Sequence, residues 1–100
     1  MGLPAVKSMG KAEYKIPGGK LLYAETEISN GRFTYVKISG DFFMHPEESI
    51  NLLEDAVKGT NVENIDYSIR HFFESNNITL FGVNPNDFLY VIKLSLNNDK

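Results

Sequence analysis

Apolar and polar residues alternate in the first half of the chain with the period of two that is typical of β-strands. Residues 12–16 form the first such segment and residues 20–28 the second. In the second segment Glu25 and Glu27 fall on one face. The opposite face carries Leu22, Ala24, Thr26 and Ile28. The pattern predicts two strands with one apolar face, separated by a short glycine-rich turn.

A third strand over residues 33–40 follows an Asn30-Gly31 pair, which is a strong hairpin signal. A two-residue loop at this pair would set Glu25 opposite Val36 and mix a charge into the apolar face. A three-residue loop keeps the apolar faces together, because it pairs Ile28 with Thr34, Thr26 with Val36 and Ala24 with Ile38. We therefore expect either a three-residue loop or a β-bulge.

The second half of the chain changes to helical spacing. Pro46 suits a first helical position, and an apolar stripe of Ile50, Leu53 and Val57 follows it. Gly59 is suited to ending this helix. The next stripe begins at a Thr60-to-Glu63 capping-box pattern and carries Val62, Ile65, Ile69, Phe72 and Phe73.

A last helix opens at Asn84-Pro85 with Asp87 in its first turn. Its apolar face carries Phe88, Val91, Ile92 and Leu96. The short apolar stretch of residues 78–81 before it fits either a strand or coil. Together the elements predict an α+β fold in which a three-stranded antiparallel meander is followed by helices packed on one face.

Composition restricts the classes of function. The chain has 100 residues and 42% hydrophobic residues, which suit one globular domain. It contains no cysteine, which removes disulfides, thiol nucleophiles and thiolate metal sites, and fits a cytoplasmic protein. No apolar run approaches the ~20 residues that span a bilayer. Residues 1–10 lack the apolar core of a signal peptide, so we expect a flexible extension there and a domain over residues 11–97.

Charge is unevenly distributed. Residues 1–20 contain four lysines and one glutamate, a net charge of +3, while the other 80 residues carry −6. An acidic remainder of this kind repels a phosphate backbone, so we expect no nucleic-acid partner. The positive charge is concentrated around one hairpin.

The candidates for catalysis and metal binding are few. His45 and His71 are isolated from each other and from any zinc-ligand pattern, and we expect them at a helix start and on a helix flank. Asp41 follows Gly40 at a strand end, where a carboxylate more often bonds nearby backbone N–H groups than acts as a general base. The sequence therefore predicts no catalytic set and no metal site.

The Pro17-Gly18-Gly19-Lys20 segment is not a phosphate-binding P-loop, because Leu21 and a strand follow it instead of a helix. A turn centred on Pro17-Gly18 would pair Lys15 with Lys20, whereas one centred on Gly18-Gly19 would set Lys15 opposite Leu22. The two lysines are either solvated or placed to contact an anion. The residues alone leave both readings open.

Several motifs in order resemble the accessory (C-terminal) domain of lipoate–protein ligases. The family pattern K-x-P-G-G-K-L matches residues 15–21, and I-x-G-D-F-F matches residues 38–43. The pattern P-E-x-x-I-x-x-L-E matches residues 46–54, and a late G-x-x-P-x-D matches residues 82–87. The resemblance covers roughly residues 11–96, almost the whole chain.

This resemblance implies a role as the separate small subunit of a two-part ligase. In the family the catalytic domain binds lipoate and ATP with Mg²⁺, forms lipoyl-adenylate and transfers the lipoyl group to a lysine of an acceptor protein. The resemblance implies that the accessory part binds no cofactor, catalyses nothing alone and is needed for adenylation. Its expected partner is the catalytic subunit in a heterodimer and, indirectly, the lipoyl-acceptor domains of 2-oxoacid dehydrogenases or the glycine cleavage H protein.

The same fold is similar to that of sulfur-transfer and iron–sulfur scaffold proteins. A stand-alone scaffold or carrier-like binding module is thus a second hypothesis, which the missing cysteines weigh against.

Two patches are the candidate binding sites for the partner or an anion. The first is the hairpin of Lys15, Pro17, Gly18, Gly19 and Lys20. The second is Gly40, Asp41, Phe42 and Phe43. Adjacent aromatic residues cannot both point inward from a regular strand, so one of the two is a candidate contact for the catalytic subunit unless a bend at Gly40 buries both.

Overall fold

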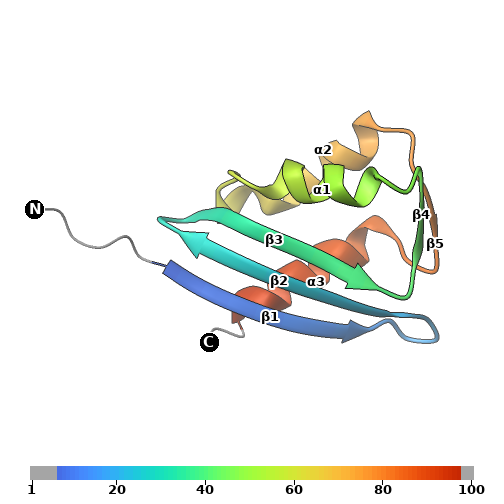
Figure 1. The fold of residues 1–100 in the computed structure, drawn as a ribbon, viewed down its shortest axis with the longest axis horizontal. Coiled ribbons are helices and arrows are strands. Elements are labelled where there is room, and N and C mark those ends of the chain that lie inside the picture. Colours follow the sequence, from blue (N-terminus) through green and yellow to red (C-terminus); the bar gives the residue numbers. More distant parts are fainter. Residues whose placement is uncertain (1–6, 98–100) are drawn as a thin grey trace, which may run out of the picture.

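The fold is that of a computed structural model that describes residues 7–97. Five strands and three α-helices occur in this range, with a 3₁₀ turn η1 (Val62–Asn64) before the second helix. The strands are β1 (Lys7–Lys15), β2 (Leu21–Ser29), β3 (Arg32–Gly40), β4 (Phe43–His45) and β5 (Thr79–Phe81). The helices are α1 (Ser49–Val57), α2 (Ile65–Ser75) and α3 (Pro85–Asn97) (Figure 1).

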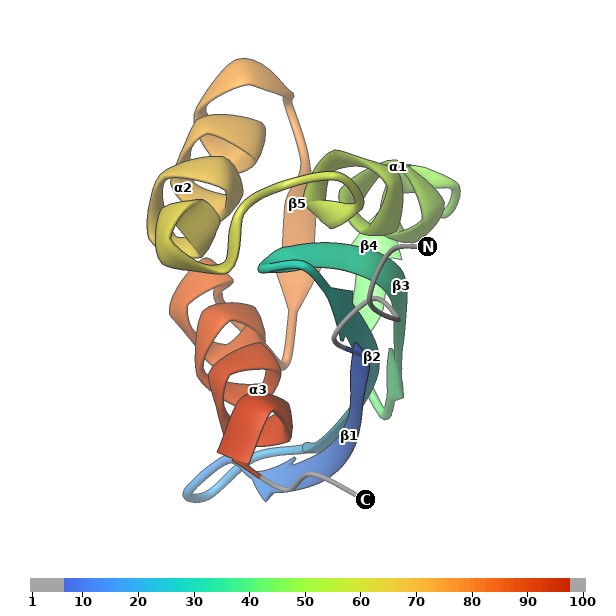
Figure 2. The ribbon, with the colours of Figure 1, turned by 90° about the vertical axis from the view of Figure 1, so that its left-hand side faces the viewer.

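The first three strands form an antiparallel sheet in the order β1-β2-β3. Helix α3 packs across β1 and β2, α1 packs against β3, and α2 rests on α1 and α3 (Figure 2). Within residues 7–97, no helix lies on the other face of the sheet (Figure 1). The predicted α+β meander with helices on one face is confirmed.

The core lies between this sheet and the helices. Strand residues with an apolar side chain on the helix side are buried, and they meet the buried stripes of α1, α2 and α3. The polar residue Thr26 belongs to the same face, and it is accommodated by a buried hydrogen bond of 2.8 Å between its hydroxyl and that of Ser95. Ser95 in turn donates to the carbonyl of Ile92 at 2.6 Å, so neither buried hydroxyl lacks a partner.

The Asn-Gly hairpin contains the expected bulge. Asn30 and Gly31 both have positive φ and form a two-residue turn, and Ser29 pairs with Arg32 across it. The register then shifts between Glu27 and Ile28, which restores the expected pairing of Thr26 with Val36 and Ala24 with Ile38. The expected pairing of Ile28 with Thr34 is wrong. Ile28 pairs with Phe33, and the bulge turns Phe33 into the core while Thr34 is exposed.

The first strand begins earlier than the sequence predicts. Residues 7–10 were expected in a flexible extension, yet they pair with β2 as the start of β1. These residues are lysine, serine, methionine and glycine, which show no clear alternation of apolar and polar side chains. The length of β2, their partner strand, decides how far the ladder extends. The remainder of the expected extension, residues 1–6, lies outside the described residues.

Two expected helix starts are wrong and one is confirmed. Pro46 lies in a turn that precedes α1. Its carbonyl accepts a hydrogen bond from the N–H of Ser49, the first residue of that helix. Thr60 donates its hydroxyl to Ala56 of the preceding helix instead of capping the next one. At α3 the side chains of Asn84 and Asp87 each accept a hydrogen bond from the backbone N–H of the other, as a capping box does.

Residues 79–81 form a strand. As β5 they pair antiparallel with β4, which makes a two-stranded ribbon at one end of the main sheet (Figure 1). The sequence left this stretch open between strand and coil, and its partner strand lies more than thirty residues earlier in the chain. Within residues 7–97 no helix has the length and apolar character needed to cross a membrane.

Candidate functional site

The Pro-Gly-Gly hairpin turns at Pro17-Gly18. The N–H of Gly19 donates to the carbonyl of Ile16 at 2.8 Å and Gly18 has a φ of 69°, as in a type II turn. A second bond of 2.8 Å from the N–H of Ile16 to the carbonyl of Lys20 adds one residue to the β2 side. Both pairings considered for Lys15 are therefore wrong, because this extra residue sets it opposite Leu21.

The two lysines of this hairpin belong to different faces. Lys15 is exposed and continues the outward-facing set of β1, because the inward-facing positions of that strand are the even-numbered ones. Lys20 lies against the connection between β5 and α3, where its Cγ is 3.0 Å from the position that a Cβ on Gly82 would take. The two lysines are therefore not directly opposite each other in the hairpin.

Gly40 is required where β3 ends. Its φ is 153°, and a Cβ there would collide with the carbonyl oxygen of Leu21. The same oxygen accepts the backbone N–H of Asp41 at 3.0 Å, so the chain passes very close to β2 at this point. The carboxylate of Asp41 is exposed and makes no hydrogen bond to a described residue, so the turn role expected for it is performed by the Asp41 backbone.

Phe42 and Phe43 point in opposite directions. Phe42 is half-buried, with its ring centroid 5.3 Å from that of Phe88 in an edge-to-face arrangement. Phe43 is 74% exposed. Of the two alternatives, the structure therefore has one partly buried ring, Phe42, and one exposed ring, Phe43, with which β4 begins.

Phe81 joins this site without having been predicted. It pairs directly with Phe43 across the β4–β5 ribbon and is 58% exposed. Residues directly opposite in an antiparallel pair have neighbouring side chains on one face. The only signal in the sequence was the ambiguous apolar stretch that contains Phe81, so the pairing of β5 with β4 was needed to find it.

One end of the molecule brings Lys20 of the first predicted patch beside the second patch. A shallow hollow of about 400 Å³ is lined by Lys20, Gly40, Asp41, Phe42 and Phe43. Of the exposed side chains at this end, Lys20, Asp41 and Phe43 line the hollow, and Phe81 pairs with Phe43. We call these four side chains the end site. It combines two aromatic rings with one positive and one negative charge, a composition that suits contact with a protein.

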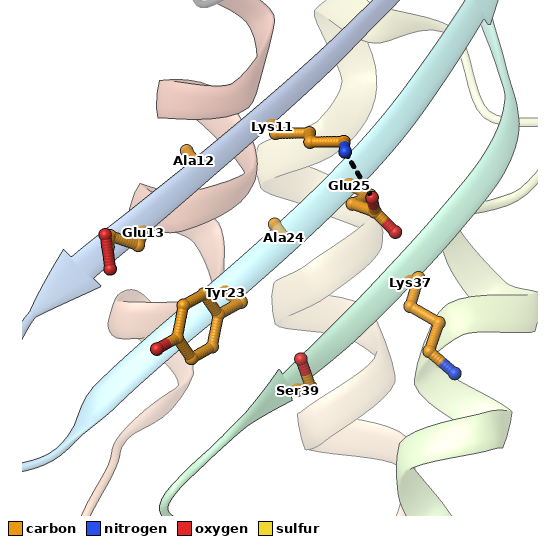
Figure 3. A pocket seen from close by; sticks show the side chains of 8 residues that line it. All are labelled: Lys11, Ala12, Glu13, Tyr23, Ala24, Glu25, Lys37 and Ser39. Atoms are coloured by element: carbon orange, nitrogen blue, oxygen red, sulfur yellow. Dashed lines mark ion pairs between the residues drawn. The ribbon is translucent and has the colours of Figure 1, made fainter.

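A second, larger hollow of about 600 Å³ lies on the open face of the sheet. Lys11 and Glu25 point toward one another there and form an ion pair of 3.3 Å, while Lys37 points away from them (Figure 3). The side chain of Lys11 is 71% exposed and that of Glu25 is 43% exposed, so solvent screens this pair and it contributes little stability. The hollow brings together charged and polar groups of adjacent strands but no nucleophile with a histidine beside it.

The histidines lie elsewhere and apart. His45 is exposed on β4, not at a helix start as expected, and His71 is exposed on α2 as expected. The ring of His71 stacks on that of Tyr67 with centroids 5.4 Å apart. Among the described residues, no group of three histidine, aspartate or glutamate side chains converges as a metal site would require.

The sequence and the fold match known proteins. No protein-family model matches the chain. Lipoate-protein ligase A subunit 2 of Thermoplasma acidophilum is 40% identical over 74 residues, which are 74% of this chain and 78% of that protein. The chain belongs to the lipoate–protein ligase A subunit 2 family.

A solved structure supports the same family. It is described as a bi-partite lipoate protein ligase and its E2 lipoyl domain from Thermoplasma acidophilum. The matching chain is 34% identical and superposes with a TM-score of 0.80 over 87% of this chain and 97% of its own length. Membership of this subunit family confirms the resemblance that the sequence motifs carried.

Proposed function

We propose that the chain is the small, non-catalytic subunit of a two-part lipoate–protein ligase and binds its catalytic subunit through the end site. Family membership supports the ligase role. The observation that carries the docking surface is the exposed pair of Phe43 and Phe81 on a rigid ribbon, beside the charges of Lys20 and Asp41. Exposed aromatic residues of this kind are frequent anchors of protein interfaces.

The chemistry is assigned to the catalytic subunit. There lipoate and ATP with Mg²⁺ react to lipoyl-adenylate and pyrophosphate, and the amine of an acceptor lysine then displaces AMP to form an amide. The acceptors are the lipoyl domains of 2-oxoacid dehydrogenases or the glycine cleavage H protein. The proposed setting is the cytoplasm, since activation consumes ATP.

The small subunit acts on this reaction through conformation. A bound subunit shifts its partner toward the adenylating state only by the difference between its affinities for the two states. The end site is built for such a differential contact, because β4 and β5 fix the positions of both rings relative to the sheet. Gly40 supports it by letting the chain turn from β3 into β4.

The role of the loop of Pro17, Gly18 and Gly19 is to hold Lys20 beside this ribbon. The turn bonds around Ile16 fix the loop, and the stem of Lys20 rests on Gly82. In this proposal Lys15 contributes less to binding the catalytic subunit, because it points to the open face of the sheet and is not part of the end site.

The function is tested by following pyrophosphate release from lipoate and ATP by the catalytic subunit with and without this chain. We expect release to depend on the chain. The double substitution Phe43→Ala and Phe81→Ala should weaken the complex by about tenfold or more while leaving the melting temperature of the isolated chain nearly unchanged. Adenylation that proceeds equally well without the chain would sink the proposal.

A matched control is Tyr67→Ala. Tyr67 is also an exposed aromatic residue, at 64%, but it lies on α2 outside the end site. Its loss should leave both binding and adenylation unchanged. If Tyr67→Ala weakens the complex as much as the double substitution does, the docking surface lies elsewhere.

A further inference from the structure

The two edges of the main sheet are treated differently by the fold. At the β3 edge Phe33 exchanges backbone hydrogen bonds of 3.0 and 2.7 Å with Thr60 and Gly59. Further along, the carboxylate of Glu54 accepts the N–H of Ile38 at 2.8 Å. The outer edge of β1 pairs with no strand among the described residues (Figure 1). An unpaired edge of this length is a template for another strand.

The register shows which groups of β1 point outward. The N–H of Ile16 points toward β2, because it donates to Lys20. In an antiparallel ladder alternate residues point the same way, so the even-numbered residues of β1 bond β2. Between residues 9 and 15, the free N–H and C=O groups on the outer edge are those of Met9, Lys11, Glu13 and Lys15.

We propose that a second copy of this chain pairs with β1 along this edge, antiparallel and two-fold symmetric about Ala12. Lys11 then lies opposite Glu13 of the second copy, and Glu13 lies opposite Lys11 of the second copy. Both residues have outward-pointing backbone groups, so each such pair is also a hydrogen-bonded pair of the ladder. The product is a continuous six-stranded sheet with two symmetric ion pairs on its open face.

Charge selects this register over its neighbours. Shifting the symmetry axis to Glu13 sets Glu13 against its own copy and Lys11 against Lys15. Shifting it to Lys11 sets two copies of Lys11 opposite each other. Like charges directly across a ladder are destabilising and opposite charges are favourable, so β1 is complementary to itself about Ala12.

On the helix side of β1 the residues nearest the symmetry axis are small. The central positions there are Gly10 and Ala12, and the axis at Ala12 sets Tyr14 of each copy opposite Gly10 of the other. Tyr14 is already in ring contact with Tyr90 of α3, at 4.5 Å between centroids, and Tyr90 is 50% exposed. The tyrosines thus extend the apolar surface of each copy to the edge that the second copy meets.

This inference goes beyond the proposed function and does not depend on it. Pairing through β1 uses none of the end site residues, because Phe43 belongs to β4, Phe81 to β5, and Asp41 and Lys20 to connections outside β1. A dimer of small subunits would therefore carry two catalytic subunits, one at each end site.

The first test measures self-association of the isolated chain by sedimentation velocity, with Glu13→Pro as the variant. Proline is tolerated where an N–H points away from a sheet, so the fold should be retained. Each dimer loses two edge hydrogen bonds and both Lys11–Glu13 ion pairs, and we expect dissociation to become easier by about tenfold or more. A wild-type chain that stays monomeric up to about 1 mM overturns the proposal, as does a dimer that Glu13→Pro leaves intact.

The second test uses charge. Glu13→Lys and Lys11→Glu each set like charges across the symmetric register, so each variant alone should self-associate more weakly than the wild type. An equal mixture of the two restores both ion pairs and should form a mixed dimer. Lys11→Glu also removes the exposed ion pair with Glu25, which a melting curve of that variant will measure.

Failure here is distinguishable from failure of the proposed function. A chain that is monomeric alone, but whose binding to the catalytic subunit is lost with Glu13→Pro, shows that a strand of that subunit occupies the edge and overturns the symmetric dimer. Mixed charge variants that associate no better than each alone overturn it as well.

Discussion

The sheet is turned at opposite ends by two hairpins that use similar local chemistry in different surroundings (Figure 1). Both have a glycine with positive φ in a tight turn, Gly31 in one and Gly18 in the other. The Asn-Gly hairpin is fixed by the rest of the fold, because Val62 donates to the carbonyl of Gly31 and Arg32 donates to that of Gly59. The Pro-Gly-Gly hairpin is fixed by its own turn bonds and by the contact of Lys20 with Gly82.

The comparison suggests a division of roles between the two ends of the sheet: one end stabilises the fold, and we propose that the other binds the partner. At the Asn-Gly end the bulge turns an aromatic ring, Phe33, into the core. At the Pro-Gly-Gly end the chain turns an aromatic ring, Phe43, out to solvent and places Phe81 beside it. One end completes the core, while the other leaves two aromatic rings exposed where we propose that the partner binds.

The largest expected effect tests the structural end. Phe33→Ala removes a fully buried ring and should lower the free energy of unfolding by about 3–5 kcal/mol. Urea denaturation followed by circular dichroism measures this loss. Thr34→Ala is the matched control, since Thr34 is exposed and its hydroxyl bonds only the neighbouring Glu27. A small loss for Phe33→Ala would mean that the bulge does not place this ring in the core.

The next largest effect tests whether the fold requires a glycine at position 40, at the Pro-Gly-Gly end of the sheet. Gly40→Ala forces a Cβ against the Leu21 carbonyl at a φ that side chains rarely adopt, so it should cost about 1–3 kcal/mol. Gly18→Ala, at a turn with open space around it, should cost less. Thermal melting of both variants gives the comparison, and equal losses would contradict the tight crossing at Gly40.

A smaller loss of stability is expected when the hydrogen bond that anchors the Asn-Gly hairpin is removed. Arg32→Ala removes an exposed hydrogen bond of 2.9 Å to the Gly59 carbonyl, which should cost about 1 kcal/mol or less. Arg32→Lys should not recover all of it, because an ammonium lacks the planar geometry of a guanidinium. If Arg32→Ala lowers the free energy of unfolding more than Gly40→Ala does, the Asn-Gly anchor contributes more stability than the tight crossing at Gly40.

The smallest effect concerns binding alone and separates the two lysines. Lys20→Ala should weaken binding to the catalytic subunit several-fold, and Lys15→Ala should leave it nearly unchanged, because only Lys20 lies in the end site. Titration calorimetry at two salt concentrations measures both variants. Equal losses would instead favour an interface that spans both faces of the hairpin.

Much of the fold follows from local patterns. Alternation in residues 20–28 placed Leu22, Ala24 and Thr26 on the buried face, because the strand period leaves no freedom once one face is covered. Register arithmetic predicted that a bulge or a longer loop must follow the Asn-Gly pair. It could not choose between them, since that choice depends on how Phe33 fits against the helices.

The candidate site was predicted in pieces. The motif residues identified the hairpin and the segment from Gly40 to Phe43, but neither pattern shows that Lys20 and Asp41 line one hollow. Phe81 was missed because a three-residue strand has too short a period to be distinguished from coil. Residues 7–10 were missed because a strand without alternation is recognisable only by its partner.

The sequence by itself determined the three long strands, the three helices, most of their buried faces and the motifs of the family, because these depend on spacings within a few residues. The tertiary structure alone decided which lysine meets which surface, which phenylalanine faces solvent and which sheet edge stays open. These features depend on pairings between segments far apart in the chain, such as β4 with β5 and β3 with the residues around Gly59. The local preferences of residues do not specify such pairing partners, which come together only in the folded protein.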